Sequence, residues 1–170
     1  MKRFTISHRI SLLILAMLLP CLTIAAEAPP TISALSYVDK QYMSQRRAEL
    51  DDLARVNLGR QFNHNKDNDL GILQSLLDEK RVRAEQKRQL QGMGVIMGNL
   101  LAHELNMHWV IYEDRLGRSR ALRYQQTDNY LFPMTMISRR LEVDNRSPVA
   151  AIYQRAVDLI KPQLPKLPFQ

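Results

Sequence analysis

Cysteine is almost absent from this chain of 170 residues, and its scarcity limits the available chemistry. The single cysteine, Cys21, lies near the end of an apolar N-terminal segment. Cleavage after Ala26 would remove it and leave a chain without any thiol. We therefore expect no disulfide, no thiol nucleophile and no cysteine-ligated metal in the mature chain.

The chain also lacks a large excess of charge of one sign. It holds 24 Lys and Arg against 17 Asp and Glu, a formal net charge of +7. Three of the basic residues precede position 27, so 21 remain against 17 and the net charge of the rest is +4. Such a surplus is typical of a solvated surface, and we expect no nucleic-acid partner.

The first 26 residues have the pattern of a secretory signal peptide. Basic residues precede the apolar run 10–19, and the small pair Ala25-Ala26 follows it. Pro20 interrupts the run, whereas a membrane span needs about 20 apolar residues, so cleavage is favoured over an uncleaved anchor. Pro20 before Cys21 also argues against a lipoprotein. We predict cleavage after Ala26, a periplasmic or secreted protein, and no transmembrane segment in the mature chain.

The remaining chain has the pattern of one small α+β domain. Pro29 and Pro30 indicate an extended leader over residues 27–33. Residues 34–161 are long enough to bury one core. Prolines at positions 162, 165 and 168 then end the periodic pattern, which predicts a proline-rich tail over 162–170.

Helical periodicity dominates the first half of the domain. It predicts a helix from Leu35 that ends near Gly59, then a polar loop over 61–68 and a short helix capped by Asp69. A third helix over 84–105 is apolar on nearly all sides in its second half, which predicts a buried central helix.

Glycines interrupt this central helix at helical spacing. Gly94, Gly98 and Ala102 lie four residues apart on one ridge, where another backbone can approach closely. The pair Gly92-x-Gly94 does not predict a dinucleotide loop, because it follows a charged helical segment rather than a strand. We expect no cofactor.

The second half of the domain begins with a β-hairpin pattern. Trp109–Tyr112 and 119–124 are joined by turn residues 114–117, and residues 130–132 offer a third short strand before Pro133. The sequence thus predicts a small antiparallel sheet of about three strands. Residues 134–141 fit either a strand or a short helix.

A C-terminal helix follows the sheet. Ser147 has the character of an N-cap and Pro148 that of a first-turn residue. The side chains expected to face inward from this helix are Val149, Ile152, Ala156, Leu159 and Ile160.

Three short motifs resemble a known family. The segments are Gly94–Trp109, the turn Asp114-x-x-Gly117, and residues 132–140 with the sequence Phe-Pro-Met-Thr-Met-Ile-Ser-Arg-Arg. They resemble the bacterial domain-of-unknown-function family 3806, from the first helix to the start of the last. The resemblance implies a small α+β domain and brings no activity, substrate or catalytic residues.

His103, Glu104 and His108 offer a weak metal or hydrolase-like site. A zincin helix needs histidines at positions i and i+4, whereas these two lie at i and i+5 and diverge by about 140° on a helix. We therefore favour a polar helix end over a metal site. An enzyme with an unrecognised site around these three residues is the alternative function.

Other candidates for catalysis are structural in character. Glu113 and Asp114 are adjacent on a strand and point to opposite faces, and we expect Asp114 to close the hairpin turn rather than to act in a carboxylate pair. Thr135 and Ser138 lie in no nucleophile elbow. The sequence gives no case for covalent catalysis.

Arginines carry the main hypothesis for a site. Arg118 and Arg120 share one strand face, Arg139 and Arg140 lie in the family-like motif, and guanidinium groups bind carboxylates or phosphates bidentately. Together, and with Trp109, they would form an anion-binding or protein-docking patch. The alternative is that one arginine pairs with a neighbouring carboxylate while the others are solvated, the candidates being Glu113, Asp114 and Glu142.

Taken together, these patterns favour a non-catalytic binding or protein-interaction module. Its partner would be a protein or a small anionic ligand of the cell envelope. An enzyme ranks second, and a peripheral envelope-associated protein ranks third. No pattern in the sequence indicates an oligomeric state.

Overall fold

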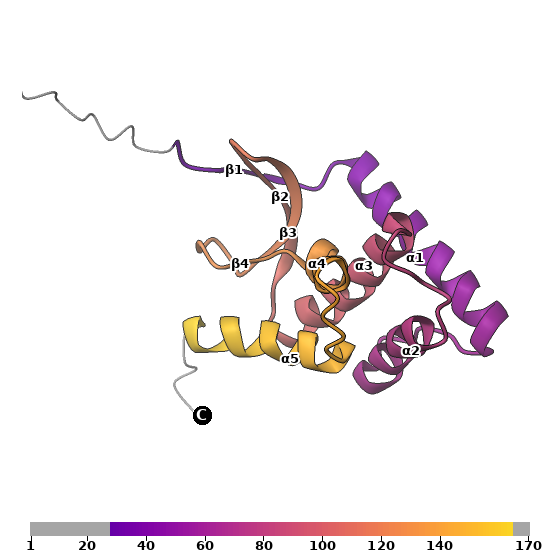
Figure 1. Cartoon of the computed structure of the whole chain (residues 1–170). Coiled ribbons are helices and arrows are strands. Elements are labelled where there is room, and N and C mark those ends of the chain that lie inside the picture. Colours follow the sequence, from indigo (N-terminus) through magenta and orange to yellow (C-terminus); the bar gives the residue numbers. More distant parts are fainter. Residues whose placement is uncertain (1–27, 165–170) are drawn as a thin grey trace, which may run out of the picture.

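The structure is a computed structural model that describes residues 28–164, a mixed α+β fold in which helices surround α3 beside a sheet (Figure 1). The predicted signal peptide and residues 165–170 of the predicted tail lie outside the described residues. The elements are β1 (Thr31–Ala34), α1 (Tyr37–Leu58), α2 (Lys66–Asp78), α3 (Lys87–Glu104), β2 (His108–Asp114), β3 (Gly117–Arg123), β4 (Tyr130–Leu131), the 3-10 turn η1 (Pro133–Thr135), α4 (Met136–Glu142), α5 (Val149–Ile160) and η2 (Lys161–Gln163).

The sheet has the order β1-β2-β3-β4 with antiparallel neighbours. It contains one strand more than predicted, because Thr31–Ala34 pairs with Val110–Glu113 of β2 rather than remaining in a leader. Four residues are too few to show a strand period in the sequence. Their pairing depends on a partner far along the chain.

The predicted hairpin is confirmed. β2 and β3 pair from His108 and Arg123 at one end to Asp114 and Gly117 at the turn. Oδ1 of Asp114 accepts a hydrogen bond of 2.8 Å from the backbone N–H of Leu116, so this carboxylate closes the turn. Gly117 adopts φ +126°, which side-chain-bearing residues rarely reach.

The central helix α3 is buried as predicted, with Met93, Met97 and Leu101 fully inaccessible. A Cβ on Gly94 would lie 2.6 Å from Cα of Met134, so the expected close approach of another backbone is made by η1. Gly98 instead accommodates the indole ring of Trp109. None of the helices within residues 28–164 has the length and apolarity needed to cross a bilayer.

The start of α2 differs from the prediction. The helix begins at Lys66, and Oδ1 of Asn65 caps it by accepting the N–H of Asn68 at 3.0 Å. Asp69, the predicted cap, is buried. It accepts the N–H groups of Asn63 and His64, each at 3.0 Å, and so holds the preceding loop in place.

The C-terminal helix also differs in detail. Pro148 occupies the N-cap position of α5, and Ser147 does not cap the helix, because its hydroxyl donates to Oδ1 of Asn145 at 2.6 Å. Leu159 is 60 % exposed rather than turned inward. The open question over residues 134–141 is resolved as helical, by η1 and α4.

The shortness of β4 determines where the sheet opens. β4 pairs only with Leu122 and Arg123, although β3 has seven residues. Pro133 has no N–H to donate and begins η1, so the ladder ends there. Within the described chain, the outer edge of β3 from Gly117 to Ala121 therefore has no strand beside it.

Candidate functional site

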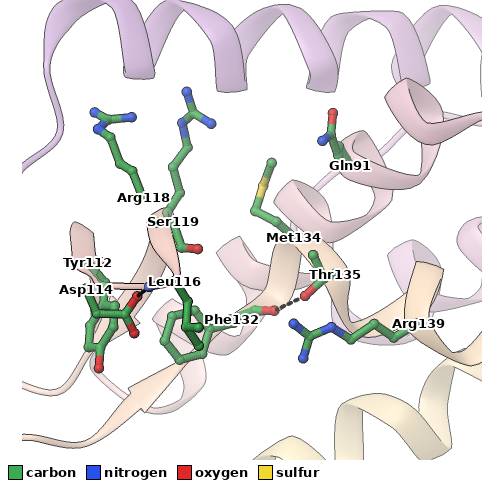
Figure 2. Close-up of a pocket in the computed structure, with 12 residues that line it drawn as sticks. Gln91, Tyr112, Asp114, Leu116, Arg118, Ser119, Phe132, Met134, Thr135 and Arg139 are labelled. Atoms are coloured by element: carbon green, nitrogen blue, oxygen red, sulfur yellow. Dashed lines mark hydrogen bonds between the residues drawn. The ribbon is translucent and has the colours of Figure 1, made fainter. Parts of the chain in front are cut away.

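A cleft of about 550 Å³ lies between the open edge of β3 and the layer formed by α3, η1 and α4 (Figure 2). We call it the arginine cleft. Its lining residues are Gln91, Tyr112, Asp114, Leu116, Gly117, Arg118, Ser119, Arg120, Phe132, Met134, Thr135 and Arg139.

Two arginines of β3 converge on one carboxylate of α1. Arg118 donates from Nη1 to Oδ1 of Asp39 at 3.1 Å and from Nη2 to Oδ2 at 2.6 Å. Nη2 of Arg120 lies 2.8 Å from Oδ1 of the same carboxylate. Asp39 is only 2 % exposed, so the residue that anchors both arginines lies beneath the cleft.

Asp39 is held in its ionised form. The hydrogen bonds from Arg118 lower the pKa of Asp39 far below its ordinary value and outweigh burial, which raises it. The hydroxyl of Ser36 donates to Oδ2 at 2.6 Å and its backbone N–H donates at 3.2 Å, and both lower the pKa further. Two guanidinium groups against one carboxylate leave this cluster with a net charge of +1.

Aromatic contacts hold Arg120 from the side of α1. Its guanidinium lies 4.3 Å from the ring centroid of Tyr42, and that of Arg46 lies 5.2 Å from the same centroid. The hydroxyl of Tyr42 donates to Oε1 of Gln91, which lines the cleft. The position of Arg120 is thus set by α1 and α3 together.

Arg139 enters the cleft from α4. Its side chain is exposed, and within residues 28–164 it has neither an ion pair nor a hydrogen bond. Figure 2 shows its guanidinium on the side of the cleft opposite β3. A full positive charge is therefore available there to a bound group.

The rest of the cleft wall combines the polar residues Asp114, Ser119 and Thr135 with aromatic and aliphatic side chains. The ring of Tyr112 packs edge-on against Phe132, with centroids 5.3 Å apart, and against Tyr130, with centroids 5.0 Å apart. Met134 is buried at the base. The cleft combines apolar side chains with polar and cationic groups, as ligand pockets commonly do.

The structure separates the other two predicted site residues from the cleft. Trp109 packs against Gly98, and its Nε1 donates to Oδ1 of Asn99 at 2.9 Å, so it belongs to the packing of α3. Arg140 lines a second cavity of about 480 Å³ beside α2 and the loop before α5. The predicted patch is thus divided, with Arg118, Arg120 and Arg139 in one place.

The residues of the alternative metal or hydrolase-like site lie on two elements, the end of α3 and the start of β2. His103 lies in the last turn of α3, and His108 begins β2. Glu104 accepts hydrogen bonds from the hydroxyl of Tyr153 at 2.8 Å and from Nζ of Lys66 at 3.2 Å. Burial raises the pKa of Glu104, but these partners lower it overall. No group of three potential His, Cys, Asp or Glu ligands occurs among residues 28–164.

Asp39, Tyr42 and Gln91 were not predicted as site residues from the sequence. A local signal existed for Asp39, because Ser36-x-x-Asp39 is the spacing of a capping box, and both reciprocal hydrogen bonds are present. No local pattern indicates that this carboxylate binds an arginine 79 residues away.

The fold has a counterpart among solved structures. A crystal structure of a protein from Bacteroides thetaiotaomicron VPI-5482 matches 79 % of this chain with a TM-score of 0.69 and 18 % sequence identity. At this identity the similarity shows a shared fold. The match covers 49 % of the Bacteroides protein, so this chain spans about half its length. Among curated proteins, none matches the chain.

A family model described as a domain of unknown function (DUF3806) matches residues 69–153, which is half of the chain. The matched region begins in α2 rather than in the first helix and includes every residue that lines the arginine cleft. Ser36, Asp39 and Tyr42, which lie beneath the cleft, precede it. The three motifs noted in the sequence also fall inside the match, and the chain belongs to the DUF3806 family.

Proposed function

We propose that the chain is an exported, non-catalytic binding module that takes an anionic group of its ligand in the arginine cleft. The observation that carries this proposal is Arg139, a cation that has no partner within residues 28–164 and faces Arg118 and Arg120 across the cleft. Guanidinium groups bind carboxylates and phosphates in a planar, two-bonded geometry, and such pairs gain strength where water is partly excluded.

The arginines of β3 are ordered before a ligand arrives. Asp39 fixes Arg118, and Asp39 with Tyr42 fixes Arg120, so a ligand would not have to immobilise two long side chains. This lowers the entropic cost of binding. Each guanidinium retains N–H groups beyond those bonded to Asp39, because it has five donors in all.

The carboxylates near the cleft support binding rather than acid–base catalysis. Asp39 is held ionised beneath the arginines, and Asp114 is bonded to the turn it closes. General acid–base catalysis requires a group that exchanges a proton near the working pH. Asp39 does not meet this requirement, because its lowered pKa keeps it ionised at neutral pH.

Binding can be tested with a simple dicarboxylate. Titration of the ¹⁵N-labelled protein with succinate should shift the amide resonances of residues that line the cleft. Arg139→Gln should weaken binding about tenfold, because an ionic hydrogen bond contributes about 1.5 kcal/mol. The matched control is Arg155→Gln, an exposed arginine on α5 away from the cleft. Shifts confined to other surfaces, or equal affinities of both variants, would contradict the proposal.

Export has a separate test. The first 26 residues carry the signal pattern, so the protein recovered from the periplasmic fraction should begin at Glu27 by intact mass. Replacing Ala26 with Arg should retain the precursor, because signal peptidase requires a small residue at the cleavage site. Full-length protein that remains in the cytosolic fraction of wild-type cells would exclude export.

A further inference from the structure

One wall of the arginine cleft is the unpaired edge of β3. β4 stops after pairing with Leu122 and Arg123, and the open edge of β3 from Gly117 to Arg120 lines the cleft. An unpaired strand edge presents a row of N–H and C=O groups that can bind another extended chain. Among the described residues, no strand pairs with this edge, and the cleft lies between it and η1, which packs near β3.

The hairpin register identifies which groups face the cleft. β2 and β3 are joined by two residues, and the pair that flanks such a turn exchanges its backbone hydrogen bonds. Gly117 therefore points its backbone groups toward β2, and alternate residues, Arg118 and Arg120, point theirs outward. The same alternation predicts that the N–H of Tyr124 points outward. It does, because it donates to the carbonyl of Asn129 on the β4 side at 3.1 Å.

Side chains along the same edge specify the occupant. Arg118 and Arg120 project from the face of β3 that meets α1, and Ser119 projects from the opposite face, where Tyr112 lies across from it. In a strand added at this edge, alternate side chains would lie beside Arg118 and Arg120 on one face of the sheet, and the side chain between them would lie beside Ser119 on the other face. Acidic side chains would meet Arg118 and Arg120, and the residue between them would meet Ser119 and the aromatic wall.

Charge favours the same occupant. The cluster of Asp39, Arg118 and Arg120 carries a net charge of +1, and Arg139 adds a second positive charge across the cleft. Asp114 at the turn also lines the cleft and carries a negative charge, so the three arginines with Asp39 and Asp114 have a net charge of +1. Acidic side chains of a bound strand would be attracted to this surplus. A peptide with acidic, apolar and acidic residues in succession matches this arrangement.

The geometry points to an acidic peptide segment of a partner protein, bound in extended form as an added strand on β3. This inference rests on the proposed function of the arginine cleft and assigns its ligand class. Backbone hydrogen bonds to Arg118 and Arg120 would provide affinity, and the alternating side chains would provide specificity, as in other complexes formed by strand addition.

The test uses a capped seven-residue peptide in which glutamate and valine alternate, titrated into the ¹⁵N-labelled protein. We expect the amides of Arg118 and Arg120 to shift and to become protected from hydrogen exchange. N-methylation of the peptide at the positions facing β3 should weaken binding at least tenfold, whereas N-methylation at the intervening positions should have little effect. Changing the glutamates to glutamines should also weaken binding. Arg139→Gln should do the same, and Arg155→Gln should not.

The outcomes separate this inference from the proposed function. If succinate binds in the cleft and the peptide does not, the peptide inference is wrong and the anion site stands. If the peptide binds but tolerates every N-methylation, it does not bind as a strand. If neither probe binds in the cleft, both proposals are wrong. Self-association by sedimentation, with protection of Arg118 and Arg120 before any peptide is added, would identify a second copy as the occupant and overturn the inference.

Discussion

The replacement Asp39→Asn tests how much the ion pairs of buried Asp39 with Arg118 and Arg120 stabilise the fold. Asparagine has nearly the same shape as aspartate, so the substitution removes the charge and leaves the packing. Asp39 is buried and accepts from Arg118 and Ser36, and it also pairs with Arg120. We expect the variant to fold and to be less stable than the wild type.

The size of the effect follows from the two arginine contacts. Hydrogen bonds to a charged partner contribute about 1.5–3 kcal/mol, and neutral ones contribute about 0.5–1.5 kcal/mol. The side chains of Arg118 and Arg120 are 44 % and 22 % exposed, so water compensates part of the loss. We therefore expect a loss of about 2–3 kcal/mol in the free energy of unfolding, or a fall of about 6–10 °C in Tm.

The loss should depend on pH in a defined direction. The bonds from Arg118 depress the pKa of Asp39 from an ordinary value of 3.8, so the folded state favours the ionised form. A depressed carboxylate contributes its full stabilisation above the unfolded pKa and loses it as pH falls toward the folded pKa. Urea unfolding should show a constant difference between wild type and Asp39→Asn from pH 7 to about pH 4.5. At lower pH the difference should shrink.

The matched control is Asp52→Asn on the same helix. Asp52 pairs with Arg55 at 2.7 Å, but both side chains are mostly exposed, so we expect a loss below about 0.5 kcal/mol. A difference between wild type and Asp39→Asn that is equally small would refute the reasoning. A large difference that persists unchanged at pH 2.5 would refute it as well, since the unfolded state then binds a proton at Asp39 that the folded state does not, which removes part of the stabilisation.

Further predictions concern α3 and its neighbours. Gly94→Ala should destabilise by about 1–3 kcal/mol, because its Cβ would meet backbone of η1 at 2.6 Å, whereas Gly71→Ala on α2 has room and should stabilise slightly. Equal unfolding midpoints in urea for these two variants would contradict the packing argument. Trp109→Phe should cost about 1–2 kcal/mol through loss of the hydrogen bond to Asn99 while leaving succinate affinity unchanged. Weaker succinate binding by that variant would place Trp109 in the site after all.

The sequence predicted those elements whose signals are local. The β-hairpin followed from alternation and turn residues, and the buried α3 followed from apolar residues on nearly every side. β1 and the cap of α2 were missed or misplaced for different reasons. β1 needs a distant partner to exist, and Asp69 turned inward to bind loop N–H groups, which leaves Asn65 as the cap.

The partner of the arginines illustrates a limit of local reasoning. Glu113 was a predicted partner, and it does lie opposite Arg118 on the same face of the hairpin. Glu113 is exposed and can be solvated, whereas the buried carboxylate of Asp39 must be paired to remain charged. The penalty for burial therefore selects Asp39 from α1, and no spacing within the hairpin could reveal it.

The division of Arg139 from Arg140 has a similar physical cause. Adjacent residues on a helix diverge by about 100°, and once residues 136–142 are helical these two arginines must face different surroundings. Pro133 determines that geometry, because it ends β4 after two residues and begins the turn into α4. The same proline leaves the edge of β3 open and carries Arg139 to the opposite side of the opening. The cleft thus arises where strand pairing stops, and its cation and its unpaired backbone have a common origin in one residue.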